Sequence, residues 1–181
     1  MLKNKLAIIG GSGLYNIEGL SNVESLKMKT PWGDPSDELT KALFKSKEVI
    51  FLPRHGRGHF ISPTKINFRA NIDALKQLGV TDIVSISAVG SLKEDLEPGM
   101  FVIVDQFIDR TFARNKTFFD DDIVAHVSMA KPTSEGLMNA CEESIKSENI
   151  QYKRGATYLV MEGPQFLSLI HISEPTRQHH I

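Results

Sequence analysis

The stretch that decides the fold is Leu6-Ala7-Ile8-Ile9-Gly10-Gly11-Ser12-Gly13, an apolar run that ends in a glycine-rich turn. This pattern is typical of a buried strand that runs into a tight loop, where exposed amides and the Ser12 hydroxyl can bind an anion. The turn lacks the third glycine of the dinucleotide fingerprint, because Asn16 stands in its place, and it lacks the lysine of a P-loop. By itself the turn is compatible with a phosphate site or with a purely structural turn.

Further segments of both regular kinds alternate along the chain. Apolar runs bounded by turn residues predict strands at 49–52, 82–88, 101–104 and 157–161. Apolar residues at helical spacing predict helices over 63–78, capped by Ser62 and ended by Gly79, and over 133–149. Interleaved strands and helices place the chain in the α/β class. We expect a single domain, because 181 residues, 41% of them hydrophobic, can bury one substantial core.

Composition excludes several classes of partner. The formal net charge of −1 gives no reason to expect a nucleic-acid or membrane partner, so a small-molecule ligand is the default. The single cysteine, Cys141, excludes an internal disulfide and a thiolate metal site, and it fits a reducing compartment. The first residues carry too few apolar positions for a signal peptide or a membrane span. We therefore expect a cytoplasmic protein.

Two more strand ends carry residues suited to an anion. Arg54 and His55 directly follow the run at 49–52, where an arginine fork and an imidazole can bind an oxyanion; a solvated basic loop or an RNA-contacting patch is the alternative. The strand at 82–88 ends in small residues, including Ser87 and Ala88, whose hydroxyl and backbone amide can face a ligand. Because ligand clefts of α/β folds open at strand ends, the three ends together predict a phosphate site.

The remaining polar features give weaker predictions. An acidic stretch lacks any metal-binding spacing, and its members are interpreted as solvated loop residues: Asp105, Asp109, Asp120, Asp121 and Asp122. His126, beside Val124 and Val127, is typical of a core or interface histidine. The turn Glu162-Gly163-Pro164-Gln165-Phe166 ends the strand at 157–161, and Phe166 can stack on a planar ligand.

The residues after Phe166 form a separate segment. Positions 167–177 read Leu-Ser-Leu-Ile-His-Ile-Ser-Glu-Pro-Thr-Arg, which resembles the translation of a common transposase sequencing adapter. We expect 167–181 to be a non-native tail and exclude it from fold reasoning. The three histidines in it, His171, His179 and His180, lack a carboxylate or thiolate framework and are not interpreted as a metal site.

Taken in order, the motifs resemble the methylthioadenosine phosphorylase branch of the purine nucleoside phosphorylases, from about residue 5 to residue 166. Asp105 to Thr111 resembles that branch in particular. The motifs are Ile8-Ile9-Gly10-Gly11-Ser12-Gly13-Leu14, Thr30-Pro31-Trp32-Gly33, Arg54-His55-Gly56, Asn71-Ile72-Asp73-Ala74-Leu75, Ala88-Val89-Gly90-Ser91-Leu92, Asp105-Gln106-Phe107-Ile108-Asp109-Arg110-Thr111 and Met161-Glu162-Gly163-Pro164-Gln165-Phe166.

The resemblance implies a fold, a reaction and a set of site residues. The fold is a nucleoside-phosphorylase-like mixed β-sheet flanked by helices, in a homotrimer. The reaction is the phosphorolysis of S-methyl-5'-thioadenosine to adenine and 5-methylthioribose 1-phosphate, with inorganic phosphate as co-substrate and with no cofactor or metal. His126 corresponds to a histidine that reaches a neighbouring subunit's site, and Phe166 to an aromatic wall of the nucleoside pocket. The residues assigned to phosphate are Ser12, Arg54, His55, Ser87 and Ala88.

The chain departs from the family pattern after Phe166. The segments that hold the ribose and read the purine, including the aspartate that activates the leaving base, are absent, so 1–166 corresponds to a partial domain that is incomplete at its C-terminus. We expect the 181-residue product to be inactive and poorly stable, because apolar surface would stay uncovered. Without the purine-reading aspartates, methylthioinosine phosphorylase and general purine nucleoside phosphorylase remain alternatives. A Rossmann-type enzyme or a non-catalytic nucleotide-binding fragment is the alternative of another class.

Overall fold

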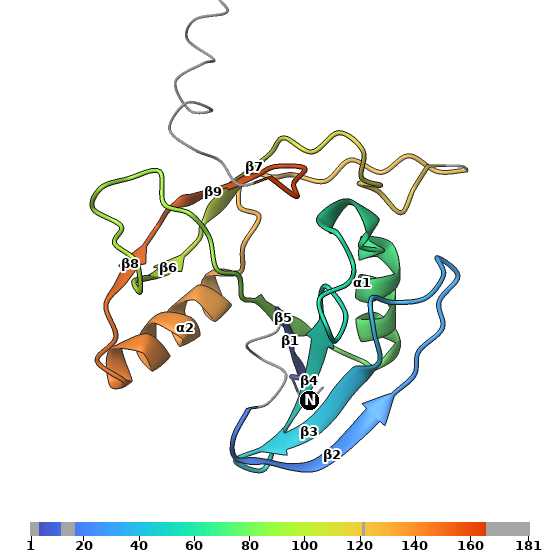
Figure 1. Cartoon of the computed structure of the whole chain (residues 1–181), viewed down its shortest axis with the longest axis horizontal. Helices are drawn as coiled ribbons and strands as arrows, with labels where there is room; N and C mark the ends of the chain where they lie inside the picture. The colour runs from blue at the N-terminus through green and yellow to red at the C-terminus, as the bar shows by residue number, and fades with distance from the viewer. Residues whose placement is uncertain (1–3, 12–16, 121, 166–181) are drawn as a thin grey trace, which may run out of the picture.

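A computed structural model describes residues 4–11, 17–120 and 122–165 (Figure 1). Its largest part is a five-stranded sheet with the strand order β2-β3-β4-β1-β5. Strand β1 is parallel to both of its neighbours, β4 and β5, whereas β3 is antiparallel to β4 and to β2. The sheet is therefore mixed, as the family resemblance implied. Its strands are β1 (Leu6–Gly10), β2 (Leu20–Leu26), β3 (Leu39–Phe44), β4 (Lys47–Pro53) and β5 (Asp82–Ser85).

The hydrophobic core lies between this sheet and helix α1 (Phe68–Gln77). Buried side chains of both layers form one cluster, and Met28, Leu78 and Ile83 are among the partly buried residues packed against it. A smaller cluster of Ala42, Val49 and Phe51 contacts Ile8, Ile17 and Leu20. Buried apolar strands hold the sheet rigidly beneath the loops that follow it. The main cluster consists of Ala7, Leu39, Ile50, Leu52, Ala74 and Leu75.

The predicted helix over 63–78 is wrong at its start. Pro63–Lys65 forms a single turn of 3-10 helix, η2, and α1 begins only at Phe68. Ser62 precedes the short turn but makes no capping hydrogen bond with its side chain. Instead the Asn67 side chain accepts a hydrogen bond from the backbone N–H of Ala70 at 3.1 Å, which is the usual contact of a helix N-cap.

A second group of elements comprises two parallel strand pairs and a helix (Figure 1). β6 (Phe101–Ile103) pairs with β8 (Tyr152–Arg154), and β7 (Gln106–Asp109) pairs with β9 (Thr157–Val160). Helix α2 (Glu135–Ser147) contacts β6 and is capped by Ser134. The strands at 101–104 and 157–161 and the helix at 133–149 are thus confirmed within a few residues at each end.

No helix within the described ranges combines the length and the apolar composition that crossing a bilayer requires.

Candidate functional site

Three neighbouring parallel strands end at the same edge of the large sheet. In the register of the sheet, Gly10 at the end of β1 lies opposite Pro53 at the end of β4, and Ile9 lies opposite Ser85 at the end of β5. The contacts continue beyond the strands: the N–H of Arg54 donates to the Gly10 carbonyl at 2.9 Å, and the N–H of Ile86 donates to the Ile9 carbonyl, also at 2.9 Å. The loops that carry the predicted phosphate residues therefore start side by side.

The side chains of Arg54 and Ser87 meet at this edge. Nη1 of Arg54 donates to Oγ of Ser87 at 2.5 Å, across 33 positions of sequence. Both residues are half-buried, and a guanidinium in such a place keeps further N–H groups for an oxyanion. Ala88 follows Ser87 and is exposed, whereas Ser12 lies outside the described residues. The structure thus brings together Arg54 and Ser87, two of the residues predicted to bind phosphate.

His55 is buried beside Arg54, with only 8% of its surface exposed. Its Nδ1 lies 2.9 Å from the carbonyl oxygen of Ile61, and its Nε2 lies 3.3 Å from Nε of Arg54. The ring stacks on His59, with 4.4 Å between the ring centroids. Burial lowers the pKa of His55 below its usual value, the nearby Arg54 and His59 lower it further, and the hydrogen bond with Ile61 acts in the opposite direction. The neutral imidazole is therefore favoured near pH 7.

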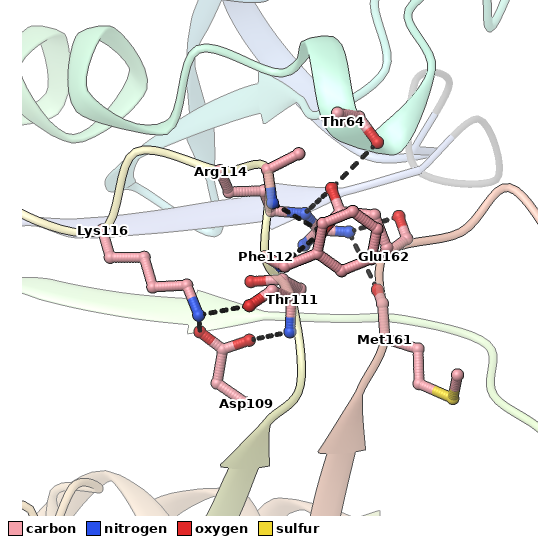
Figure 2. A network of polar contacts seen from close by, with 9 residues as sticks. Thr64, Asp109, Thr111, Phe112, Arg114, Lys116, Met161 and Glu162 are labelled. Carbon is pink, nitrogen blue, oxygen red and sulfur yellow. Dashed lines mark hydrogen bonds and ion pairs between the residues drawn. The ribbon is translucent and has the colours of Figure 1, made fainter.

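A second polar cluster, which was not predicted from the sequence, surrounds Glu162 at the end of β9 (Figure 2). Its carboxylate accepts hydrogen bonds from the N–H groups of Phe112 at 2.8 Å and Ala113 at 3.2 Å, and from the hydroxyl of Thr64 at 3.0 Å. The hydrogen bond from the Phe112 N–H is the main reason that the pKa of Glu162 lies below its usual value. Glu162 was predicted only as part of a turn, because its partners lie about 50 and 98 positions away.

Arg114 completes this cluster from the loop after β7. Its Nη2 donates to the carbonyl oxygens of Met161 at 2.9 Å and Glu162 at 2.8 Å, and its Nε lies 3.6 Å from the Glu162 carboxylate. The guanidinium also lies over the ring of Phe68, the first residue of α1. Glu162 and Arg114 together join the start of α1, the loop after β7 and the end of β9.

Asp109 is the residue of the acidic stretch for which the loop interpretation is wrong. It is the last residue of β7, and its carboxylate accepts the N–H of Thr111 at 2.8 Å and pairs with Nζ of Lys116 at 3.0 Å. These contacts, the Thr111 N–H first, lower its pKa to about 2. Asp105, Asp120 and Asp122 are exposed, and Asp121 lies outside the described residues. Within the described part of the chain, no group of three or more His, Cys, Asp or Glu side chains could hold a metal ion.

His126 is exposed in an irregular segment, with Val124 and Val127 exposed on either side of it. The interpretation as a core histidine is therefore wrong, and the interpretation as an interface histidine stays a prediction. Phe166 and the three histidines of the tail lie outside the described residues.

Comparison with known proteins places the chain in a family. The model of the family described as "Phosphorylase superfamily" matches residues 5–169. The S-methyl-5'-thioadenosine phosphorylase of Cereibacter sphaeroides is 55% identical over 168 residues, which are 93% of this chain and 58% of that protein. The protein of the same name from Rhodospirillum rubrum is 56% identical over 164 residues, covering 91% of this chain and 56% of the relative. The chain thus spans less than two thirds of the length of these relatives.

Solved structures agree with the sequence matches. A methylthioadenosine phosphorylase from an antarctic soil metagenomic library superposes with a TM-score of 0.90 at 47% identity, covering 97% of this chain and 62% of that chain. The methylthioadenosine phosphorylase of Schistosoma mansoni superposes with a TM-score of 0.88 at 32% identity, covering 98% of this chain and 70% of that chain. Because the family model matches most of the chain and the mixed sheet superposes on these enzymes, the chain belongs to the phosphorylase superfamily.

Proposed function

We propose that this chain is the phosphate-binding part of an enzyme that cleaves S-methyl-5'-thioadenosine with inorganic phosphate, giving adenine and 5-methylthioribose 1-phosphate. The observation that carries the proposal is the contact between Arg54 and Ser87 where β1, β4 and β5 end. The choice of this nucleoside is supported by eight relatives named S-methyl-5'-thioadenosine phosphorylase, which are 48–56% identical to this chain.

In the proposed reaction, the protein acts by positioning and by electrostatics. Arg54, Ser87, the backbone amide of Ala88 and the glycine turn with Ser12 hold the phosphate below the sugar. Its negative charge then stabilises the positive charge that develops on the sugar ring as the bond to the purine breaks. A separate acid protonates the departing base, and we place that acid outside residues 1–166. Residues 1–166 are then a partial phosphorylase domain, and 167–181 a non-native tail.

The other elements of the proposal follow from the resemblance. Phe166 walls the nucleoside pocket, and His126 enters the site of a neighbouring subunit in a homotrimer. The exposure of His126, Val124 and Val127 in the isolated chain supports a role at an interface. We propose that the enzyme is cytoplasmic, that its partners are the purine nucleoside and phosphate, and that it needs no cofactor.

The test is a comparison of substrates with the full-length enzyme. The DNA downstream of codon 166 in the source genome is read, the complete protein is purified, and phosphate-dependent release of base is measured with methylthioadenosine, methylthioinosine and inosine. We expect methylthioadenosine to have the highest kcat/KM, and Arg54→Ala to lower kcat/KM by about 100-fold or more, which corresponds to losing a charged contact to the phosphate. Preference for a 6-oxopurine nucleoside, or base release that does not require phosphate, would contradict the proposal.

A further inference from the structure

Both ring nitrogens of His55 have partners, and the partners determine where the proton lies. The carbonyl oxygen of Ile61 can only accept, so Nδ1 of His55, 2.9 Å away, must carry a proton. Nε of Arg54 carries a hydrogen and has no acceptor capacity, so it can only donate, and Nε2 of His55, 3.3 Å away, must accept. Only the neutral imidazole with its proton on Nδ1 satisfies both contacts.

The two contacts of Arg54 fix its guanidinium group at both ends. Its Nε donates to His55, and its Nη1 donates to Ser87. An arginine fork held at two points loses less conformational entropy when it binds an oxyanion, because its orientation is set in advance. The remaining N–H groups of the fork are free of these two contacts and can bind a tetrahedral anion.

The groups around His55 also favour the neutral imidazole. Among the residues that the structure describes, the charged and titratable groups that face its ring are the Arg54 guanidinium and the stacked His59. A proton on Nε2 would point at the N–H of Arg54 and would put two cations in contact in a buried place. Protonation of His55 therefore breaks the hydrogen bond that holds Arg54.

We propose that His55 is a positioning residue for Arg54. It holds the guanidinium as a neutral Nδ1–H imidazole and does not donate to the bound anion itself. This role replaces the direct hydrogen bond to phosphate that was predicted for His55 from the sequence, and it rests on the proposed phosphate site.

The first test reads the tautomer directly in the 181-residue chain. The histidines are labelled with ¹⁵N, and ring-nitrogen shifts are recorded with and without inorganic sulfate, an anion that does not titrate near neutral pH. The signals of His55 are those lost in His55→Gln, and His59→Gln is the matched control on the same loop. We expect a protonated Nδ1 and an unprotonated Nε2 in both states. A proton on Nε2 in the sulfate-bound chain would overturn the proposal.

The second test asks whether His55 acts through Arg54. Sulfate affinity is measured for the wild type, for His55→Phe, for Arg54→Lys and for the double variant. We expect His55→Phe to weaken binding about tenfold in the wild type, as for a lost hydrogen bond to a charged group. In the Arg54→Lys background the loss should be less than about twofold, because lysine has a methylene carbon at the position of the arginine Nε and therefore no N–H there to donate to the imidazole. Equal losses in both backgrounds would show direct contact and overturn the proposal.

Failure of the proposed function would give a different result. If the nucleoside assignment alone is wrong, the full-length enzyme releases no adenine from methylthioadenosine, while sulfate still binds and the His55 tautomer is unchanged. If the wild-type chain binds neither sulfate nor phosphate, the phosphate site and the role of His55 both fail.

Discussion

Asp109 and Glu162 show how one carboxylate at the end of a strand organises the loop that follows. Asp109 ends β7 and binds the N–H of Thr111, two positions further on. Glu162 follows β9 and binds the N–H groups of Phe112 and Ala113, which lie in the loop after β7. Because β7 and β9 are paired in parallel, both carboxylates act on the same loop.

The pKa of Asp109 leads to a prediction about stability and pH. A carboxyl group whose pKa is lower in the folded state than in the unfolded state stabilises the fold fully at pH values above its unfolded-state pKa, near 4. It loses this contribution as the pH falls toward its folded-state pKa of about 2. We expect Asp109→Asn to lower the free energy of unfolding by about 1 kcal/mol at pH 7, because the carboxylate is partly exposed.

Urea unfolding of both proteins between pH 7 and pH 3 measures this effect. The difference between wild type and Asp109→Asn should stay constant down to about pH 4 and narrow below it. Asp122→Asn, at an exposed position of the same stretch, is the control. A difference that grows on acidification would contradict the assignment.

At the residue scale, the sequence predicted which residues lie at the site better than it predicted the contacts that these residues make. Arg54 and Ser87 were predicted because each follows an apolar run, and parallel strands bring such ends together. The partners of His55 and Glu162 could not be predicted, because they depend on how a loop folds back and on contacts between distant segments. Asp109 was assigned to a loop because the short apolar pair Phe107-Ile108 forms too weak a strand pattern.

At the scale of elements, the buried parallel strands and the amphipathic helices were predicted, and four strands were missed. β2 is mostly exposed, and β3 interrupts its apolar residues with Thr40 and Lys41. β7 and β8 have four and three residues. Such strands form because a partner supplies the hydrogen bonds, so their own sequence carries little signal.

The sequence also predicted the start of α1 too early. Ser62 followed by Pro63 has the usual composition of a helix start, but Ile66 adopts an extended conformation that interrupts the helix. Asn67 then caps α1 and donates through its amide to the Trp32 carbonyl at 2.7 Å. One side chain thus fixes both the start of α1 and its position against the Trp32 loop.

We expect Asn67→Ala to lower the free energy of unfolding by about 1 to 2 kcal/mol, since the helix loses its N-cap. Asn67→Asp keeps the capping oxygen and loses only the donor to Trp32, so it should destabilise less. Ser62→Ala is the control and should have little effect, because the Ser62 side chain makes no capping contact. The order of the three variants in urea unfolding decides the point: a larger loss for Ser62→Ala than for Asn67→Ala would show that the helix starts at Pro63.

At the scale of the whole molecule, the Glu162 cluster joins two groups of elements. Thr64 lies in η2, which precedes α1 in the chain, whereas Phe112 and Arg114 follow β7 in the second group. Apolar side chains remain exposed in the second group, among them Phe101, Ile108 and Met161. The predicted inactivity and poor stability of the 181-residue chain stay predictions.

We expect Glu162→Ala to weaken the contacts between the two groups of elements without disturbing the core of the sheet. The N–H groups of Phe112 and Ala113 would lose their acceptor, and Arg114 would lose its charged partner. Hydrogen exchange should then be faster at Phe112 and Ala113 and unchanged in β1 and β4. Glu143→Ala, at an exposed position of α2, is the control. Unchanged exchange at Phe112 would show that the carboxylate does not hold the loop.

The central claim is that the ends of β1, β4 and β5 form a phosphate site, and binding of inorganic phosphate to the purified 181-residue chain tests it most directly. Titration calorimetry should show saturable binding to the wild type, at least about tenfold weaker binding to Arg54→Ala, and unchanged binding to the control Arg110→Ala, at an exposed position after β7. Equal affinity of the wild type and Arg54→Ala, or no saturable binding to the wild type, would contradict the claim.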